Sequence, residues 1–194
     1  MRLTTLLATA SAGLGCAGTA TYLGLVTGRL SLDLGIGRRT RPLGPITVDI
    51  AAPREVVYAA AVAPYAERRP RAMAEKVRIL ARSDQMVLAA HHTPVGKRLT
   101  AVTVETVTFD PPQRIGFRLV RGPVPEVTET FALQPTDTGT RLTYTGELST
   151  DLGRLGELWG DLVTRTWIAA VEASLELIKA ESERRAGNSP RTTA

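Results

Sequence analysis

The stretch from Glu126 to Leu148, EVTETFALQPTDTGTRLTYTGEL, decides the fold of this chain. Apolar and polar side chains alternate on both sides of the turn Asp137–Gly139. Because successive side chains of a strand point to opposite faces, each half of the stretch has one apolar and one polar face. The stretch therefore predicts two antiparallel strands that are joined by a short turn and buried on one side.

One residue does not fit the apolar face of this hairpin. Glu129 shares that face with Val127 and Phe131, and Gly146 lies on the same face of the returning strand. A carboxylate on an apolar face costs free energy unless it borders water, a partner or a ligand. We therefore expect a sheet whose concave side is not simply a filled core.

The same alternation continues outside the hairpin. We expect seven strands, at 46–50, 76–82, 85–92, 98–109, 114–121, 126–134 and 140–148. Short turns rich in Asp, Gly, Pro and Ser join the last six, which makes these strands antiparallel. A helix is expected between Pro53 and Pro64, with a short helical or irregular piece after it. Apolar residues at every third or fourth position from Leu155 to Ile178 predict a long final helix, and hence an α+β domain.

This order of elements, with the phrases APREVVY, FDPPQRI and DTGTRLTYTGEL, resembles the SRPBCC superfamily of START-like or Bet v1-like proteins. That superfamily includes the polyketide cyclase/dehydrase and lipid transport group. The resemblance covers about residues 44–185 and implies a helix-grip fold. In such a fold a curved seven-stranded antiparallel sheet wraps around the long C-terminal helix, and a hydrophobic cavity lies between them. The resemblance implies no catalytic residue, because the superfamily has none in common.

Strand pairing across the turns extends the concave face. With Phe109 opposite Ile115, this face gains Glu105 as a second inward carboxylate. Together with the final helix, it gives the following expected ligand-binding residues: Met86, Leu88, His92, Glu105, Val107, Phe117, Leu119, Glu129, Phe131, Tyr144, Trp159, Val163 and Trp167.

Three roles stay open for the inward carboxylates Glu105 and Glu129. They could lie at an open rim or pair with an arginine such as Arg98 or Arg165. They could anchor the polar end of a ligand. They could also transfer protons, because burial raises a carboxyl pKa toward neutrality, and the candidates for catalysis are then Glu105, Glu129 and Tyr144.

Composition excludes several classes of site. Cys16 is the only cysteine, and with just two histidines the chain has no disulfide framework and too few ligands for a Cys/His zinc site. We expect neither a metal nor a cofactor. Most of the net charge of +5 lies in residues 1–41, which hold five arginines and one acid. Because the remainder is nearly neutral and the chain is only 5% aromatic, we expect no nucleic-acid partner.

Residues 3–28 carry no charge and would form a helix of roughly 39 Å, which exceeds the ~30 Å core of a bilayer. We therefore expect a transmembrane anchor at 1–28 and a basic juxtamembrane linker at 29–43. The domain follows at 44–186, with a disordered tail at 187–194. The arginines after the apolar stretch predict a single-pass membrane protein with a cytoplasmic domain. The alternative is export after cleavage of a signal peptide.

Taken together, these features predict a membrane-anchored protein that binds or transfers a lipid or another hydrophobic small molecule, held between sheet and C-terminal helix. The alternative is a polyketide cyclase/dehydrase-like enzyme that uses the cavity carboxylates. A membrane-anchored interaction domain with a filled cavity is a third possibility. The expected partners are thus a hydrophobic ligand and the membrane, and the oligomeric state is left open.

Overall fold

The computed structural model describes residues 19–95 and 99–188. Seven strands form one sheet in the order β1-β7-β6-β5-β4-β3-β2, and every neighbouring pair is antiparallel. The strands are β1 (Arg39–Ile50), β2 (Val77–Arg82), β3 (Met86–Val95), β4 (Leu99–Asp110), β5 (Arg114–Arg121), β6 (Glu126–Thr136) and β7 (Gly139–Thr150). The helices are α2 (Arg54–Val62), η1 (Ala63–Tyr65), α3 (Arg71–Lys76) and α4 (Arg154–Asn188). The expected seven-stranded sheet with a long C-terminal helix is confirmed.

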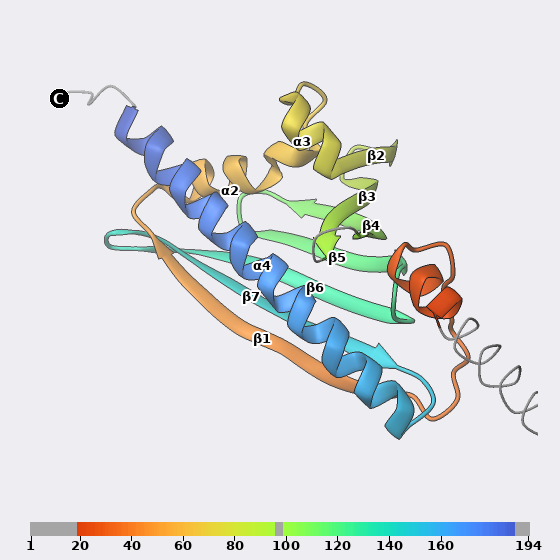
Figure 1. The fold of residues 1–194 in the computed structure, drawn as a ribbon. Coiled ribbons are helices and arrows are strands. Elements are labelled where there is room, and N and C mark those ends of the chain that lie inside the picture. Colours follow the sequence, from red (N-terminus) through yellow and green to blue (C-terminus); the bar gives the residue numbers. More distant parts are fainter. Residues whose placement is uncertain (1–18, 96–98, 189–194) are drawn as a thin grey trace, which may run out of the picture.

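Figure 1 shows how these elements are layered. The long helix α4 runs across one side of the curved sheet, and α2 lies beside its C-terminal half. The short helix α3 lies over β2 and β3 at the other edge of the sheet. The sheet therefore grips α4, as the resemblance implied.

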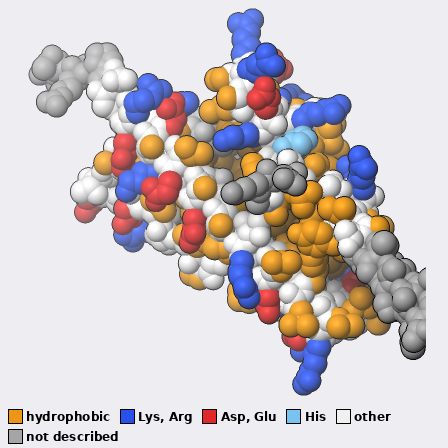
Figure 2. All heavy atoms as spheres, in the orientation of Figure 1, with side chains coloured by type: hydrophobic (Ala, Val, Ile, Leu, Met, Phe, Trp, Pro, Cys, Tyr) orange, Lys and Arg blue, Asp and Glu red, His pale blue; other side chains and the backbone are white. Residues whose placement is uncertain are grey.

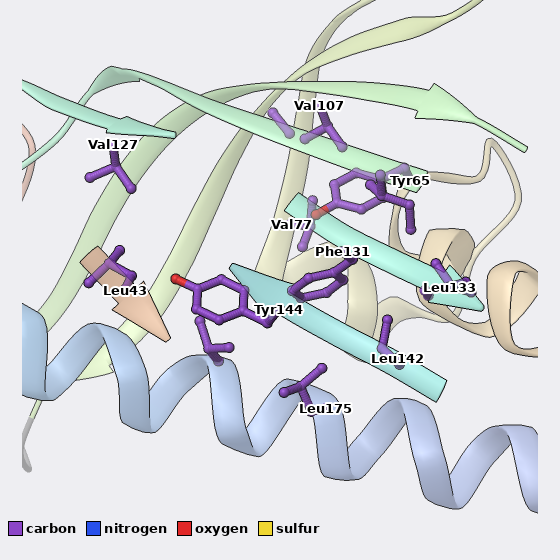
Figure 3. Close-up of a cluster of buried hydrophobic side chains, with 14 of the residues drawn as sticks. Leu43, Tyr65, Val77, Val107, Val127, Phe131, Leu133, Leu142, Tyr144 and Leu175 are labelled. Carbon is purple, nitrogen blue, oxygen red and sulfur yellow. The ribbon is translucent and has the colours of Figure 1, made fainter. Parts of the chain in front are cut away.

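The apolar face of α4 closes the core. Leu175 is only 1% exposed and lies close to Leu142 and Tyr144 of β7, both fully buried (Figure 3). Burying a leucine side chain stabilises a fold by roughly 1.5–3 kcal/mol, so contacts of this kind hold α4 on the sheet.

The first strand begins earlier than the sequence predicts. Residues 39–43, placed in a basic linker, form the first part of β1, because Arg39 pairs with Thr150 of β7. The register shifts between Leu43 and Ile46. Gly44 makes this irregularity possible, since its φ is +84° and a Cβ there would lie 2.9 Å from the carbonyl oxygen of Tyr144. β1, an edge strand of the sheet, is therefore longer than the stretch 46–50 in which apolar and polar residues alternate.

The end of the expected apolar anchor packs on the domain. Residues 19–26 are helical, and the Tyr22 ring meets the edge of Trp159 at 6.0 Å between centroids. Val26 is 7% exposed. Gly28 has φ +67° and approaches Val102 so closely that a Cβ would lie 2.4 Å from its carbonyl oxygen. These residues are therefore part of the folded domain.

This packing corrects the prediction of a single-pass membrane protein with a cytoplasmic domain. Within residues 19–95 and 99–188, no helix has both the length and the apolar character needed to cross a membrane. The described helical residues 19–26 end two residues before the positive-φ turn at Gly28. The rest of the predicted span, residues 1–18, lies outside the described residues.

Three arginines of the expected juxtamembrane linker, Arg38, Arg39 and Arg41, form ion pairs with acids at or just before the start of α4. Arg39 lies 2.9 Å from Glu157, and Arg41 is paired with Asp161. Arg38 lies 2.9 Å from Asp151, whose other carboxylate oxygen accepts hydrogen bonds from the backbone amides of residues 34 and 35. The hydrogen bond from Arg38 holds the pKa of Asp151 at about 2. The positive charge is thus used within the domain. Of the expected tail, residues 187 and 188 belong to α4, and 189–194 lie outside the described residues.

Candidate functional site

The concave face of β4 to β7 has the register expected from the sequence. Phe109 lies opposite Ile115 across the β4–β5 turn. Glu129 lies opposite Gly146 on one side and Phe117 on the other. Both predicted carboxylates therefore share the face that looks toward α4.

Glu129 is held by donors from two different elements. Its Oε1 accepts a hydrogen bond of 2.6 Å from the Tyr144 hydroxyl of β7 and another of 2.6 Å from the Trp167 indole N–H of α4. Gly146 leaves room for this side chain, since a Cβ there would lie 3.1 Å from Glu129 Cγ. The carboxylate is therefore fixed in place between sheet and helix.

The environment of Glu129 favours its neutral form. Burial raises the pKa of Glu129, the negative charge of Glu105 raises it further, and the result is about 7. The hydrogen bonds from Tyr144 and Trp167 favour the ionised form, but they do not offset the burial. Near neutral pH this carboxyl group can therefore either hold or release a proton.

Glu105 belongs to a second polar group on the same face. Thr103 donates a hydrogen bond of 2.7 Å to its Oε1. His91 Nδ1 lies 3.2 Å from its Oε2, as an ion pair rather than a well-aligned hydrogen bond. The Tyr65 hydroxyl lies 3.0 Å from His91 Nε2. A chain of polar groups thus runs from β4 across β3 to η1.

In this second polar group, the attraction between Glu105 and His91 outweighs the effect of burial on their pKa values. Burial alone would raise the pKa of Glu105, but the charge of His91 outweighs it and leaves that pKa below its ordinary value. Burial likewise works against protonated His91, yet Glu105 raises the net pKa of the imidazole. Both effects favour the ionised pair Glu105–His91.

The faces of β3 are opposite to the prediction. Val87 pairs with Val107 and Ala89 with Glu105, so the odd-numbered residues of β3 point inward. Met86, Leu88 and His92, expected to line the cavity, therefore belong to the other face, and Met86 is 40% exposed. The physical reason is that residues 86–90 are apolar on both faces, so alternation could not decide the register and a shift of one residue reverses every side chain.

Two residues of the site were missed, His91 and Tyr65. Tyr65 is 8% exposed, and its ring lies 5.8 Å from that of Phe109. The inward position of Glu105 could have predicted His91 as its partner. A buried carboxylate requires a partner, and His91 and His92 lie on the neighbouring strand. Arg165 forms no ion pair within the described part of the chain, and Arg98 lies outside it.

Inward-facing aromatic rings border space that solvent can reach. Phe117 of the sheet and Trp167 of α4 are only partly buried, whereas Val107, opposite Phe117 on β4, is fully buried. Trp159 is also partly exposed, and its indole N–H donates a hydrogen bond of 2.7 Å to the carbonyl of Pro123. Figure 2 shows hydrophobic side chains gathered near the middle of the face that carries α4. Phe117, Trp159 and Trp167 are therefore not fully shielded from solvent.

A separate hollow of about 480 Å³ lies on the surface between β1 and α4. Its lining includes the ion pair of Arg41 and Asp161, with Arg154 and Glu157 beside it, and neither inward carboxylate contributes to it. Paired, exposed charges offer little to an apolar ligand, so this hollow is not the candidate site. Within the described residues, no group of three or more His, Cys, Asp and Glu side chains could hold a metal ion.

Comparisons with known proteins identify the family and support the fold. The sequence model of the family described as "Polyketide cyclase / dehydrase and lipid transport" matches residues 46–183. No curated protein sequence gives a significant match.

Solved structures share the fold at low sequence identity. The Zhui aromatase/cyclase from Streptomyces sp. R1128 has a TM-score of 0.56 and 21% identity, with 76% of this chain and 95% of that chain covered. Norcoclaurine synthase from Thalictrum flavum has a TM-score of 0.59 and 14% identity, with 82% and 95% covered. A protein from Thermus thermophilus has a TM-score of 0.54 and 20% identity, with 77% and 97% covered. At these identities the likeness shows the fold alone.

Proposed function

The chain belongs to the polyketide cyclase/dehydrase and lipid transport family, and from this premise we propose that it binds a hydrophobic small molecule between the concave face of the sheet and α4. One observation carries the proposal. Glu129 is an inward carboxylate that donors from β7 and α4 hold in place among aromatic rings. A few fixed polar groups in an apolar cavity are typical of small-molecule sites.

Aromatic rings supply the apolar part of the proposed site. The Phe117 and Phe131 rings lie 5.2 Å apart, and the Phe131 and Tyr144 rings 5.8 Å apart. In this proposal the ligand lies along these rings, and Trp167 covers it from α4. The remaining proposed contacts are Val107, Leu119, Trp159 and Val163.

Binding can be tested with Nile red, a neutral apolar dye whose fluorescence rises in apolar surroundings. The full chain should bind it saturably, and Val163→Phe should weaken binding at least tenfold, about 1.4 kcal/mol, because Val163 is 8% exposed and packs in the core that α4 shares with the sheet, where the larger ring would occupy the proposed site. Leu177→Phe is the matched control, since Leu177 lies on the same helix but is 63% exposed. Circular dichroism would show that both variants are folded. No saturable binding by the wild-type chain, or equal effects of both substitutions, would contradict the proposal.

Acid–base catalysis on a bulky apolar substrate is the second candidate function. It is favoured by the pKa of Glu129, about 7, which suits a general base at neutral pH, with Tyr144 as hydrogen-bond donor. For a polyketide-like substrate, kcat/KM should rise with pH through about 7, and Glu129→Gln should lower kcat by roughly 100-fold or more while binding survives. Unchanged turnover by Glu129→Gln would remove this role and leave the binding function intact.

A further inference from the structure

Only one of the two inward carboxylates of the candidate site has a charged partner. Glu105 forms an ion pair with His91 at 3.2 Å. Glu129 has no ion pair within the described residues, and both donors to it, Tyr144 and Trp167, are neutral groups. An ionised carboxylate at this site is therefore costly, because the described residues supply no counter-charge to Glu129.

One oxygen of Glu129 is free to meet a ligand. Both hydrogen bonds go to Oε1, and within residues 19–95 and 99–188 no hydrogen bond or ion pair reaches Oε2. The two donors, from β7 and α4, fix the plane of the carboxylate. A cationic donor at Oε2 would therefore meet an oriented acceptor without disturbing the existing hydrogen bonds.

The surroundings of Glu129 suit a cation as well as an apolar group. Phe117 lies directly across from it on β5, and Trp167 reaches it from α4. Aromatic faces attract an ammonium group through their quadrupole, and this attraction grows when water is excluded. A neutral hydroxyl would gain neither this attraction nor the ion pair, and an anionic group would be repelled by both Glu129 and Glu105.

We propose that the site around Glu129 selects hydrophobic molecules that carry a protonated amine, with the ammonium group donating to Glu129 Oε2 and the apolar part lying against Phe117 and Trp167. This inference rests on the proposed binding function and names the chemical class of its ligand. When Glu129 is protonated in the free protein, binding of the ammonium ionises it, and that proton leaves to solvent.

Three probes with one ring system separate the possibilities: naphthylmethylamine, naphthylmethanol and naphthoate. At pH 8, calorimetry should show the amine binding at least about tenfold more tightly than the alcohol, and the acid most weakly. Glu129→Gln keeps an acceptor for Tyr144 and Trp167 and should bring the amine-to-alcohol ratio close to one. Glu147→Gln, on the exposed outer face of β7, should leave the ratio unchanged.

The outcomes distinguish the two proposals. Equal binding of amine and alcohol, or an amine preference that survives Glu129→Gln, would overturn the amine inference and leave the binding function standing. If none of the three probes and no Nile red binds, the binding function itself fails.

Proton release provides a test that needs no substitution. The titratable groups that face Glu129 are Tyr144, Glu105 and His91; Tyr144 stays neutral because burial raises its pKa, and Glu105 and His91 remain paired. At pH 7 the amine should therefore release about half a proton per molecule bound, and the alcohol none. Calorimetry in two buffers of different ionisation enthalpy measures this number. Amine binding without proton release at pH 7 would overturn the inference.

Discussion

At the scale of single residues, two identical side chains on one face have opposite electrostatic environments. Glu105 faces His91, whose charge outweighs the effect of burial and lowers the pKa of this carboxyl. Glu129 faces only neutral donors, so burial and the charge of Glu105 raise its pKa to about 7. The difference lies in the partner that the neighbouring strand supplies. Glu129 is therefore the group that can change its charge near neutral pH.

Glu129 should also affect stability in a defined pH window. Its folded pKa of about 7 lies above the ordinary value of 4.5, so between these values the folded state keeps a proton that the unfolded state has lost. The free energy of unfolding therefore falls as pH rises through this window, by at most about 1.4 kcal/mol per pH unit from this group. Glu129→Gln has no carboxyl group to titrate at this position and so does not lose this free energy of unfolding. Its stability relative to wild type should therefore increase from about pH 5 to pH 7 in urea titrations.

The control for this series is Glu147→Gln, an exposed acid on the outer face of β7. It reports the effect of removing one exposed carboxyl group, and Glu129→Gln should gain stability more steeply than this control between pH 5 and pH 7. If Glu129→Gln shows no steeper gain than the control, the raised pKa of Glu129 is refuted.

At the scale of elements, alternation worked where one face of a strand is polar. In β6 and β7, threonines and charged residues mark the outer face, so Glu129 and Tyr144 were correctly placed inward. In β3 both faces carry apolar residues, so the sequence did not determine which histidine points inward. Pairing with β4 decided it, because Thr103 stands opposite His91.

Two glycines of α4 should respond to alanine in opposite ways. A Cβ at Gly156 would lie 1.7 Å from the carbonyl oxygen of Asp151, so Gly156→Ala forces the backbone apart and should destabilise the fold by roughly 2 kcal/mol or more. A Cβ at Gly187 would meet nothing within 4 Å. Gly187→Ala should therefore stabilise by up to about 1 kcal/mol through helix propensity. Thermal unfolding of the two variants checks both signs, and a stabilising Gly156→Ala would contradict the close approach.

At the scale of the whole molecule, contacts between residues far apart in the sequence hold the segment 22–38 against the region around the start of α4. Asp151 joins the start of α4 to Leu34, Gly35 and Arg38, more than a hundred residues earlier. Tyr22 reaches Trp159 in the same region. These contacts explain why residues 19–38, which belong to the predicted membrane anchor and linker, pack on the domain.

The sequence by itself determined the α+β class, the seven antiparallel strands, the long final helix and the inward carboxylates Glu105 and Glu129. These features depend on local signals, since turn residues and side-chain periodicity act over a few neighbouring positions. The tertiary structure alone decided that His91 faces Glu105, that Trp167 holds Glu129, and that residues 19–38 pack on the fold. These arrangements depend on strand register and on contacts between sequence-distant residues, which the local pattern does not specify.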